Sequence, residues 1–168
     1  MLTVRRAEPE DAMDVAGVHV RAWQRAYRGL LDDRYLERLR PEDRAVRYSF
    51  EGRPDQPLTI VAEERGPVRG FVTISPSRTA TGASTGELLA LYVDPESWGQ
   101  GIGRVLILEA RRRMVERGHR AAEVWVLAGN ERAERFYRAD AWEAGKGRRR
   151  REAWGVLADE LRYRRRLG

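Results

Sequence analysis

The stretch YVDPESWGQGIGRVL, residues 92–106, places three glycines within five positions, at Gly99, Gly101 and Gly103. Apolar residues typical of a strand precede these glycines, and a helix-like apolar pattern follows them. Glycine loses more conformational freedom on folding than other residues, so its repeated use at a strand-to-helix turn calls for a compensating gain. Close approach of an anionic ligand to free N–H groups at a helix start is such a gain. The stretch therefore predicts a phosphate-binding turn, and a glycine-rich turn that binds nothing remains the alternative.

The spacing of these glycines excludes two familiar phosphate loops. A dinucleotide-binding G-x-G-x-x-G would need a third glycine where Arg104 or Leu106 stands. A P-loop ends in G-K-[ST], whereas the only lysine of the chain, Lys146, lies far downstream. The turn must therefore serve a different kind of phosphate ligand.

Working outward, the remaining chain is typical of one mixed α/β domain over residues 1–168. Predicted strands cover residues 2–8, 58–64, 68–76, 87–95, 121–129, 141–147 and 156–167, and predicted helices cover 9–29, 30–39, 41–52, 101–117 and 130–139. A stripe of Met13, Ala16, Val20, Trp23 and Tyr27 marks the buried face of the first helix. The fourth and fifth strands are joined through a helix and should be parallel neighbours. We expect a largely antiparallel sheet of about seven strands, flanked by helices.

Composition limits the function classes. The chain has 42% hydrophobic and 35% charged residues, which is typical of a globular protein, and no apolar run approaches the roughly 20 residues of a membrane span. It contains no cysteine and two histidines, so we expect neither disulfides nor a metal site. No secretory signal is visible at the N-terminus, and the default expectation is a cytoplasmic protein without a membrane partner.

The net charge of +6 raises the alternative of a nucleic-acid-binding protein. The excess is confined to residues 145–168, which hold nine basic and three acidic residues. An exposed hairpin with solvated arginines accounts for this better than a nucleic-acid site, and its positive potential would also attract small anionic ligands. We expect no nucleic-acid partner, and a homodimer stays open.

A second pattern lies downstream of the glycines. Asn130, Ala133, Phe136 and Tyr137 form N-x-x-A-x-x-F-Y at the start of a predicted helix that follows a strand. Together with the glycine turn and the order of elements, this pattern resembles the GCN5-related N-acetyltransferase (GNAT) superfamily over essentially the whole chain. The cofactor loop of that family reads [QR]-x-x-G-x-[GA]. This sequence departs from it at the first position, where Trp98 stands in place of glutamine or arginine.

The resemblance implies an acetyl-CoA-dependent acyltransferase, with acetyl-CoA as co-substrate, no metal, and direct transfer of an acetyl group to a primary amine. The implied cofactor-binding residues are Leu91, Tyr92, Val93, Gly99, Gln100, Gly101, Ile102, Gly103, Arg104, Asn130 and Phe136. In this family the strand before the loop offers its backbone to the pantetheine arm, as an added strand would.

The resemblance also assigns catalytic roles. An alkylammonium must lose a proton before its nitrogen can attack, and the departing thiolate benefits from a proton donor. Tyr137 is the candidate acid, and a purely packing role for Phe136 and Tyr137 is the alternative. Glu87, at the start of the fourth strand, is the candidate base, with a water chain as the alternative. Asn130 would hold the pantetheine arm or merely cap its helix.

The acceptor is a small-molecule or peptide amine whose identity the sequence leaves open. In this family the first helices line the acceptor site, so Trp23, Tyr27 and Asp32, with neighbouring Asp33, are expected wall residues for a cationic acceptor. The two aromatic residues could equally belong to the core.

Two other functions remain to be weighed. A non-catalytic acyl-CoA sensor would carry the same cofactor motifs. A serine hydrolase is hinted at by G-x-S-x-G at residues 82–86, with Ser84, Asp94 and His119 in the required chain order. The hydrolase elbow must follow a strand and open a helix, however, whereas Ser84 precedes a strand, so the sequence disfavours this function.

Overall fold

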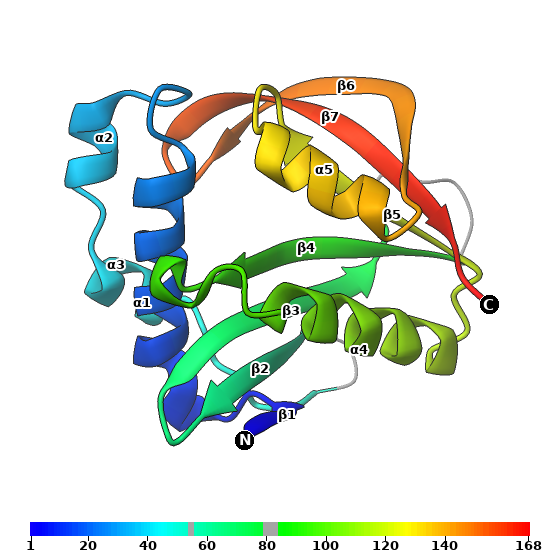
Figure 1. The fold of residues 1–168 in the computed structure, drawn as a ribbon, viewed down its shortest axis with the longest axis horizontal. Helices are drawn as coiled ribbons and strands as arrows, with labels where there is room; N and C mark the ends of the chain where they lie inside the picture. Colours follow the sequence, from blue (N-terminus) through cyan, green and yellow to red (C-terminus); the bar gives the residue numbers. More distant parts are fainter. Residues whose placement is uncertain (54–55, 79–83) are drawn as a thin grey trace.

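A seven-stranded sheet forms the centre of the computed structural model, which describes residues 1–53, 56–78 and 84–168 (Figure 1). Its strands are β1 (Leu2–Arg6), β2 (Leu58–Glu64), β3 (Val68–Pro76), β4 (Thr85–Val93), β5 (Ala121–Leu127), β6 (Glu143–Ala153) and β7 (Val156–Arg166). They lie in the order β1-β2-β3-β4-β5-β7-β6. All neighbours are antiparallel except β4 and β5, which are parallel. The predicted fold class, the order of elements and the single parallel pair are confirmed.

The parallel pair separates along its length. Only the first four residues of β4, from Thr85 to Leu88, pair with β5, although β4 continues to Val93. In addition, the pairing of β4 with β3 shifts by one residue, so that Leu89 is bulged out of the ladder. Bulges bend a strand and increase its twist. From Leu89 onward, the edge of β4 that faces β5 is therefore not paired with that strand.

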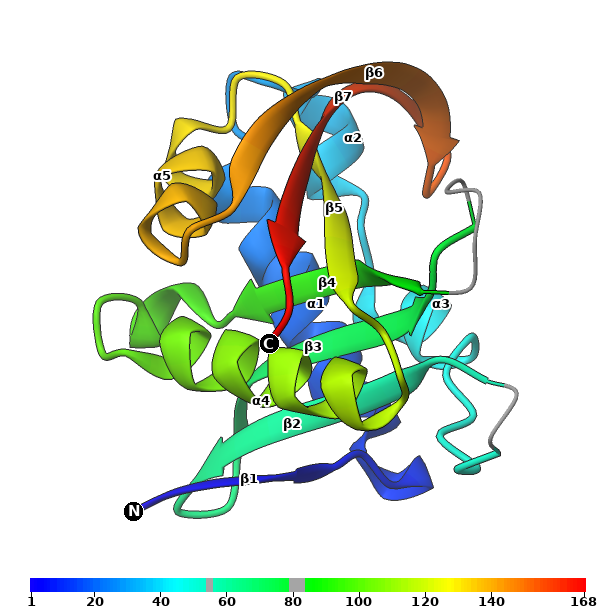
Figure 2. The same ribbon diagram turned by 90° about the vertical axis from the view of Figure 1, so that its right-hand side faces the viewer.

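Helices cover both faces of the sheet (Figures 1 and 2). They are α1 (Ala12–Ala26), α2 (Asp33–Glu37), α3 (Pro41–Ala45), α4 (Ile102–Glu116) and α5 (Glu131–Ala139), with single 3₁₀ turns at Pro9–Asp11 and Pro95–Ser97. Helices α4 and α5 bury the main core, which includes Leu106 and Tyr163. On the other face, Val15 and Val18 of α1 pack against Val61 and Phe71.

The structure corrects several local expectations. Met13, predicted on the buried stripe of the first helix, is 50% exposed, because the buried face of α1 runs through Val15 and Val18 instead. The sixth strand is longer than predicted and includes Arg148 and Arg151, because cross-strand pairing with β7 offsets its lack of apolar residues. Of the segment between the strands predicted at 68–76 and 87–95, residues 79–83 lie outside the described part, and β4 begins at Thr85, earlier than predicted. In the part of the chain that the structure describes, no helix is long and apolar enough to cross a membrane.

Candidate active site

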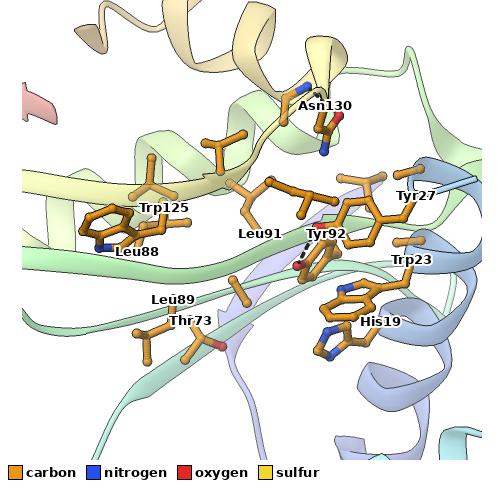
Figure 3. A pocket seen from close by; sticks show the side chains of 18 of the residues that line it. His19, Trp23, Tyr27, Thr73, Leu88, Leu89, Leu91, Tyr92, Trp125 and Asn130 are labelled. Carbon is orange, nitrogen blue, oxygen red and sulfur yellow. Dashed lines mark hydrogen bonds between the residues drawn. The ribbon is translucent and has the colours of Figure 1, made fainter. Parts of the chain in front are cut away.

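A cavity of about 950 Å³ opens where β4 and β5 separate (Figure 3). Its walls come from α1, the segment around α3, strands β3 to β7, the turn before α4 and the first turns of α5. Asn130 marks the α5 end, and Trp23 and His19 of α1 mark another wall. With the exception of Gln100, Asp32 and Asp33, every residue predicted for the site lines this cavity.

The glycine loop, residues 98–103, has a backbone that only glycine adopts readily. Gly99 and Gly101 have φ angles of 77° and 81°, in the left-handed region, and a Cβ atom at either position would meet no other atom within 4 Å. Gly101 is the N-cap of α4, and the first bond of the helix runs from Val105 N to Gly101 O at 3.1 Å. The amides that precede this bond lack an intrahelical acceptor and lie at the positive end of the helix dipole. The loop thus offers an open cradle for an anion.

Gly103 serves a different purpose from the other two glycines. A Cβ atom there would lie 3.1 Å from Cε2 and 3.4 Å from Cζ of Phe136 on α5. Its φ angle is not left-handed, so the turn conformation does not call for glycine here. Close packing between α4 and α5 favours it, because a Cβ atom would have to displace the Phe136 ring slightly. Of the three glycines, two shape the loop and one admits the neighbouring helix.

Trp98, the departure from the family loop, is held firmly in place. Its indole Nε1 donates a hydrogen bond to the Val93 carbonyl at 2.8 Å. The Arg132 guanidinium on α5 stacks over the Trp98 ring, with Cζ 3.4 Å from the ring centroid. The Cζ atom of Arg25 lies 5.9 Å from the same centroid. A guanidinium over an indole face is a favourable cation–π arrangement. Arg132 therefore brings a positive charge to the loop position where the family pattern has a polar or basic side chain. Arg132 is not among the residues predicted for the site, although it lies inside the N-x-x-A pattern.

Helix α5 brings Asn130 and Tyr137 to the cavity. The Asn130 side chain accepts a hydrogen bond from Ala133 N at 3.2 Å and so caps the helix. The Tyr137 ring is buried among aromatic neighbours, with centroids 5.2 Å from Phe136 and 5.6 Å from Trp142. Its hydroxyl has no hydrogen-bond partner among the described residues. Burial raises the pKa of Tyr137 above its ordinary value, so the phenol keeps its proton throughout the neutral range.

The start of β4 carries Glu87, which is 2% exposed and lines the cavity. One carboxylate oxygen accepts a hydrogen bond from Arg78 N at 3.3 Å, and the other lies 3.6 Å from the Arg78 guanidinium. The carboxylate is thus an ion-pair partner as well as a candidate base.

Of the predicted acceptor residues, the two aromatic ones line the cavity, and neither Asp32 nor Asp33 does. The Tyr27 hydroxyl lies 3.2 Å from that of Tyr92, and Trp23 packs against Tyr27 (Figure 3). Asp32 is exposed, and its side chain accepts a hydrogen bond from Arg34 N at the N-cap of α2. Aspartate is a preferred N-cap residue, and this preference could have indicated from the sequence that Asp32 caps α2 instead of lining the cavity.

A cluster of rings forms much of the wall near α1. This aromatic wall consists of His19, Trp23, Tyr48, Phe71, Tyr92 and Trp154, all of which line the cavity. His19 stacks on Tyr92 with centroids 4.8 Å apart and lies 4.6 Å from Trp154. Burial, aided by the charge of Arg44, lowers the pKa of His19 well below its ordinary value, so this imidazole is neutral. No sequence motif predicts these residues as a group, because they come from five separate segments.

Trp154 holds an unusual backbone conformation at the tip of the β6–β7 hairpin. Its φ angle is 55°, a region that bulky residues rarely adopt, and Gly155 follows at 83°. Two contacts hold it there: its carbonyl accepts a hydrogen bond from the Tyr35 hydroxyl, and its ring lies 4.8 Å from that of Trp23. The strained turn thus carries a large ring back over the mouth of the cavity.

The serine hydrolase alternative fails on geometry. Ser84 and Asp94 flank the nine-residue strand β4, which separates them by roughly 30 Å at about 3.3 Å per residue. Asp94 is already engaged, since its carboxylate lies 2.7 Å from the Arg21 guanidinium. No catalytic triad can form from these residues.

Comparisons with known proteins agree with this geometry. Residues 21–141 match the acetyltransferase (GNAT) family. The chain is 33% identical over 133 residues to the uncharacterized N-acetyltransferase YuaI of Bacillus subtilis, covering 77% of this chain and 74% of that protein. It is 34% identical over 138 residues to an uncharacterized N-acetyltransferase of Archaeoglobus fulgidus, covering 81% and 89%. In fold it is similar to the PaiA N-acetyltransferase of Thermoplasma acidophilum, solved in complex with coenzyme A, with a TM-score of 0.76, 21% identity and 99% of each chain covered. The chain belongs to the GNAT family of acetyltransferases and is an N-acetyltransferase.

Proposed function

We propose that the protein transfers an acetyl group directly from acetyl-CoA to a primary amine that enters from the α1 side. The observation that carries this proposal is a single cavity joining the open amide cradle at the glycine loop to the Tyr137 hydroxyl. Acetyl-CoA would supply the activated thioester. The residues present suit it, because the loop leaves room for phosphate oxygens and the unpaired stretch of β4 can accept a pantetheine arm along its backbone.

The cofactor-binding residues divide by the part of the molecule that they would hold. The amides of Ile102, Gly103 and Arg104 would bind the pyrophosphate, with Arg132 adding a charge beside Trp98. Backbone groups of Leu91, Tyr92 and Val93 would bind the amides of the pantetheine arm. Gln100, which does not line the cavity, would contribute only its backbone.

Tyr137 would donate a proton to the departing sulfur. Its phenol keeps its proton at neutral pH, its hydroxyl is uncommitted, and its buried ring fixes the orientation of the side chain. Packing and acid catalysis are compatible here, since the ring contacts the core while the hydroxyl reaches the cavity.

Glu87 would accept the proton of the incoming amine, directly or through water. Its place on the cavity wall supports this role, whereas its ion pair with Arg78 gives the carboxylate a second, structural use. The substitution Glu87→Gln distinguishes the two roles: loss of a base lowers kcat/KM, whereas loss of an ion pair alone leaves kcat/KM largely unchanged.

Release of free thiol from acetyl-CoA in the presence of an amine panel, with mass spectrometry of the amines, tests the function. We expect an acetylated amine, kinetics that require both substrates bound together, and no acetylated protein. Binding of acetyl-CoA without turnover of any amine would instead favour an acyl-CoA sensor. A trapped acetyl-protein would contradict direct transfer.

A further inference from the structure

The charges around the cavity are unequal. Eight arginines and three glutamates line it: Arg44, Arg47, Arg78, Arg104, Arg132, Arg135, Arg149 and Arg151, against Glu87, Glu152 and Glu160. Two of the glutamates are ion-paired. Glu87 lies 3.6 Å from Arg78, and Glu160 lies 2.8 Å from Arg149 and 3.1 Å from Arg151. The third, Glu152, is exposed on the hairpin. The cavity therefore favours anionic groups over cationic ones.

Part of this charge belongs to the cofactor end. Arg104, Arg132 and Arg135 lie on the first turns of α4 and α5, where phosphates would bind. Arg44 is separate from them, because it projects from α3 beside the aromatic wall. Its role therefore needs its own explanation.

Arg44 has no acidic partner among the residues that the structure describes. Its Cζ lies 5.4 Å from the ring centroid of Tyr48 and 5.1 Å from that of Trp154, and its Nε donates to the Tyr48 hydroxyl at 3.3 Å. The side chain is half-buried, so its charge is only partly screened by water. The rings fix its position, while most of its donors stay free for an anion.

The aromatic wall offers a second unsatisfied group next to Arg44. His19 is 4% exposed, its Nδ1 lies 2.9 Å from the Tyr48 hydroxyl, and its buried Nε2 has no hydrogen-bond partner in the described protein. An unpaired buried polar atom is costly, and a ligand that completes its bonding removes that cost. Planar rings on several sides also favour an apolar or aromatic body.

We propose that the acceptor is an α-amino acid with an apolar or aromatic side chain, whose carboxylate pairs with Arg44 and whose side chain packs on the aromatic wall. This inference rests on the proposed function and narrows its substrate class. It replaces the cationic acceptor expected from the sequence. Polyamines, aminoglycosides and lysine-rich segments are disfavoured, because no unpaired buried carboxylate among the described residues lines the acceptor side.

Acetyl transfer to the α-amino group accounts for each bond and proton as follows. The α-nitrogen, after losing one proton, attacks the thioester carbonyl; the new C–N bond forms as the C–S bond breaks. The departing thiolate takes the proton of Tyr137, and the attacking nitrogen releases its second proton, which restores the phenol through water. The products are an N-acetyl amino acid and free coenzyme A.

Matched pairs of amines test the carboxylate. Phenylalanine is compared with 2-phenylethylamine, and methionine with 3-(methylthio)propylamine, so that each pair differs in the carboxylate. Turnover is followed by thiol release, and binding to the coenzyme-A-saturated protein is followed by calorimetry. We expect about a tenfold to a hundredfold preference for the member with the carboxylate, the range of one charge-assisted hydrogen-bond pair.

Variants of α3 tie this preference to one side chain. Arg44→Gln should abolish most of it, and Arg44→Lys should keep part of it because the charge remains. Arg40→Gln, the same change at an exposed N-cap residue of that helix outside the cavity, is the matched control and should keep all of it.

An equal or reversed preference in both turnover and binding would overturn the inference, as would a preference that survives in Arg44→Gln. Failure of the proposed function looks different. In that case coenzyme A itself would not bind at the glycine loop, or acetyl-CoA would bind and no amine of any class would be acetylated.

Discussion

At one end of the cavity the proposed binding groups belong to the backbone, and at the other they belong to side chains. The glycine loop is a contiguous segment whose amides converge because Gly99 and Gly101 adopt left-handed conformations. The aromatic wall and Arg44 come instead from α1, the α3 region, β3, β4 and the β6–β7 turn. Backbone amides suit a ligand part that never changes, while side chains can be replaced without altering the fold. The contrast teaches that cofactor binding and acceptor choice can be perturbed separately.

The largest effect is expected from a substitution at Tyr137, which lies between the cofactor end and the acceptor end of the cavity. Tyr137→Phe keeps the ring and its packing but removes the acidic proton, so kcat should fall by roughly a hundredfold with little change in coenzyme A affinity. The raised pKa has a further consequence: the acid form persists as pH rises, so the wild-type kcat should show no loss below about pH 10 that depends on this phenol. An unchanged kcat in single-turnover measurements would reduce Tyr137 to packing.

The next largest effect is expected from a substitution in the glycine loop, at the cofactor end of the cavity. Gly101→Ala places a side chain in the open cradle and should weaken coenzyme A binding about tenfold, as a few charge-assisted bonds are lost. A short thioester without the nucleotide should be far less affected. The control for backbone strain alone is Gly118→Ala. Gly118 follows α4 with a φ angle of 89°, and a Cβ atom there would stand in open space, but Gly118 does not line the cavity.

Both glycine variants should lose similar stability, about 1–2 kcal/mol for a left-handed alanine, as seen by chemical denaturation. Equal coenzyme A affinities, measured by calorimetry, would mean that the loop needs its glycines only for shape.

A smaller effect is expected from a substitution of Arg132. It tests whether this arginine supplies the charge at the loop position where the family pattern has glutamine or arginine and this chain has Trp98. Arg132→Gln should weaken coenzyme A binding about three- to tenfold at low salt, with a smaller deficit at high salt because an exposed charge is screened. Arg138→Gln on the same helix, outside the cavity, is the matched control. Salt-independent weakening equal in both variants would point to loss of helix structure rather than of a phosphate contact.

The smallest effect is expected at Asp32. Asp32→Asn removes the charge but keeps a good N-cap, so kcat/KM for the acceptor should change less than about twofold and stability should be preserved. A large rise in KM for an amine would show that the loop before α2 closes over the acceptor.

The sequence by itself determined the order of elements, the parallel pair and the glycine loop with its helix. These follow from local patterns: apolar periodicity, glycine at a strand-to-helix turn, and the Asn130–Tyr137 spacing on one helix. It did not reveal the close contact between Gly103 and Phe136, because that contact is made with a second helix.

Only the tertiary structure decided the acceptor side. His19, Arg44 and Trp154 are far apart in the chain and carry no shared spacing, and each is an ordinary core or surface residue when read alone. Packing of α3 on α1 and of α1 on β4, together with the β6–β7 turn folding back, brings them together around one cavity. The physical reason is that local propensity fixes which segments form, whereas side chains from separate segments acquire a joint chemistry only once the segments pack.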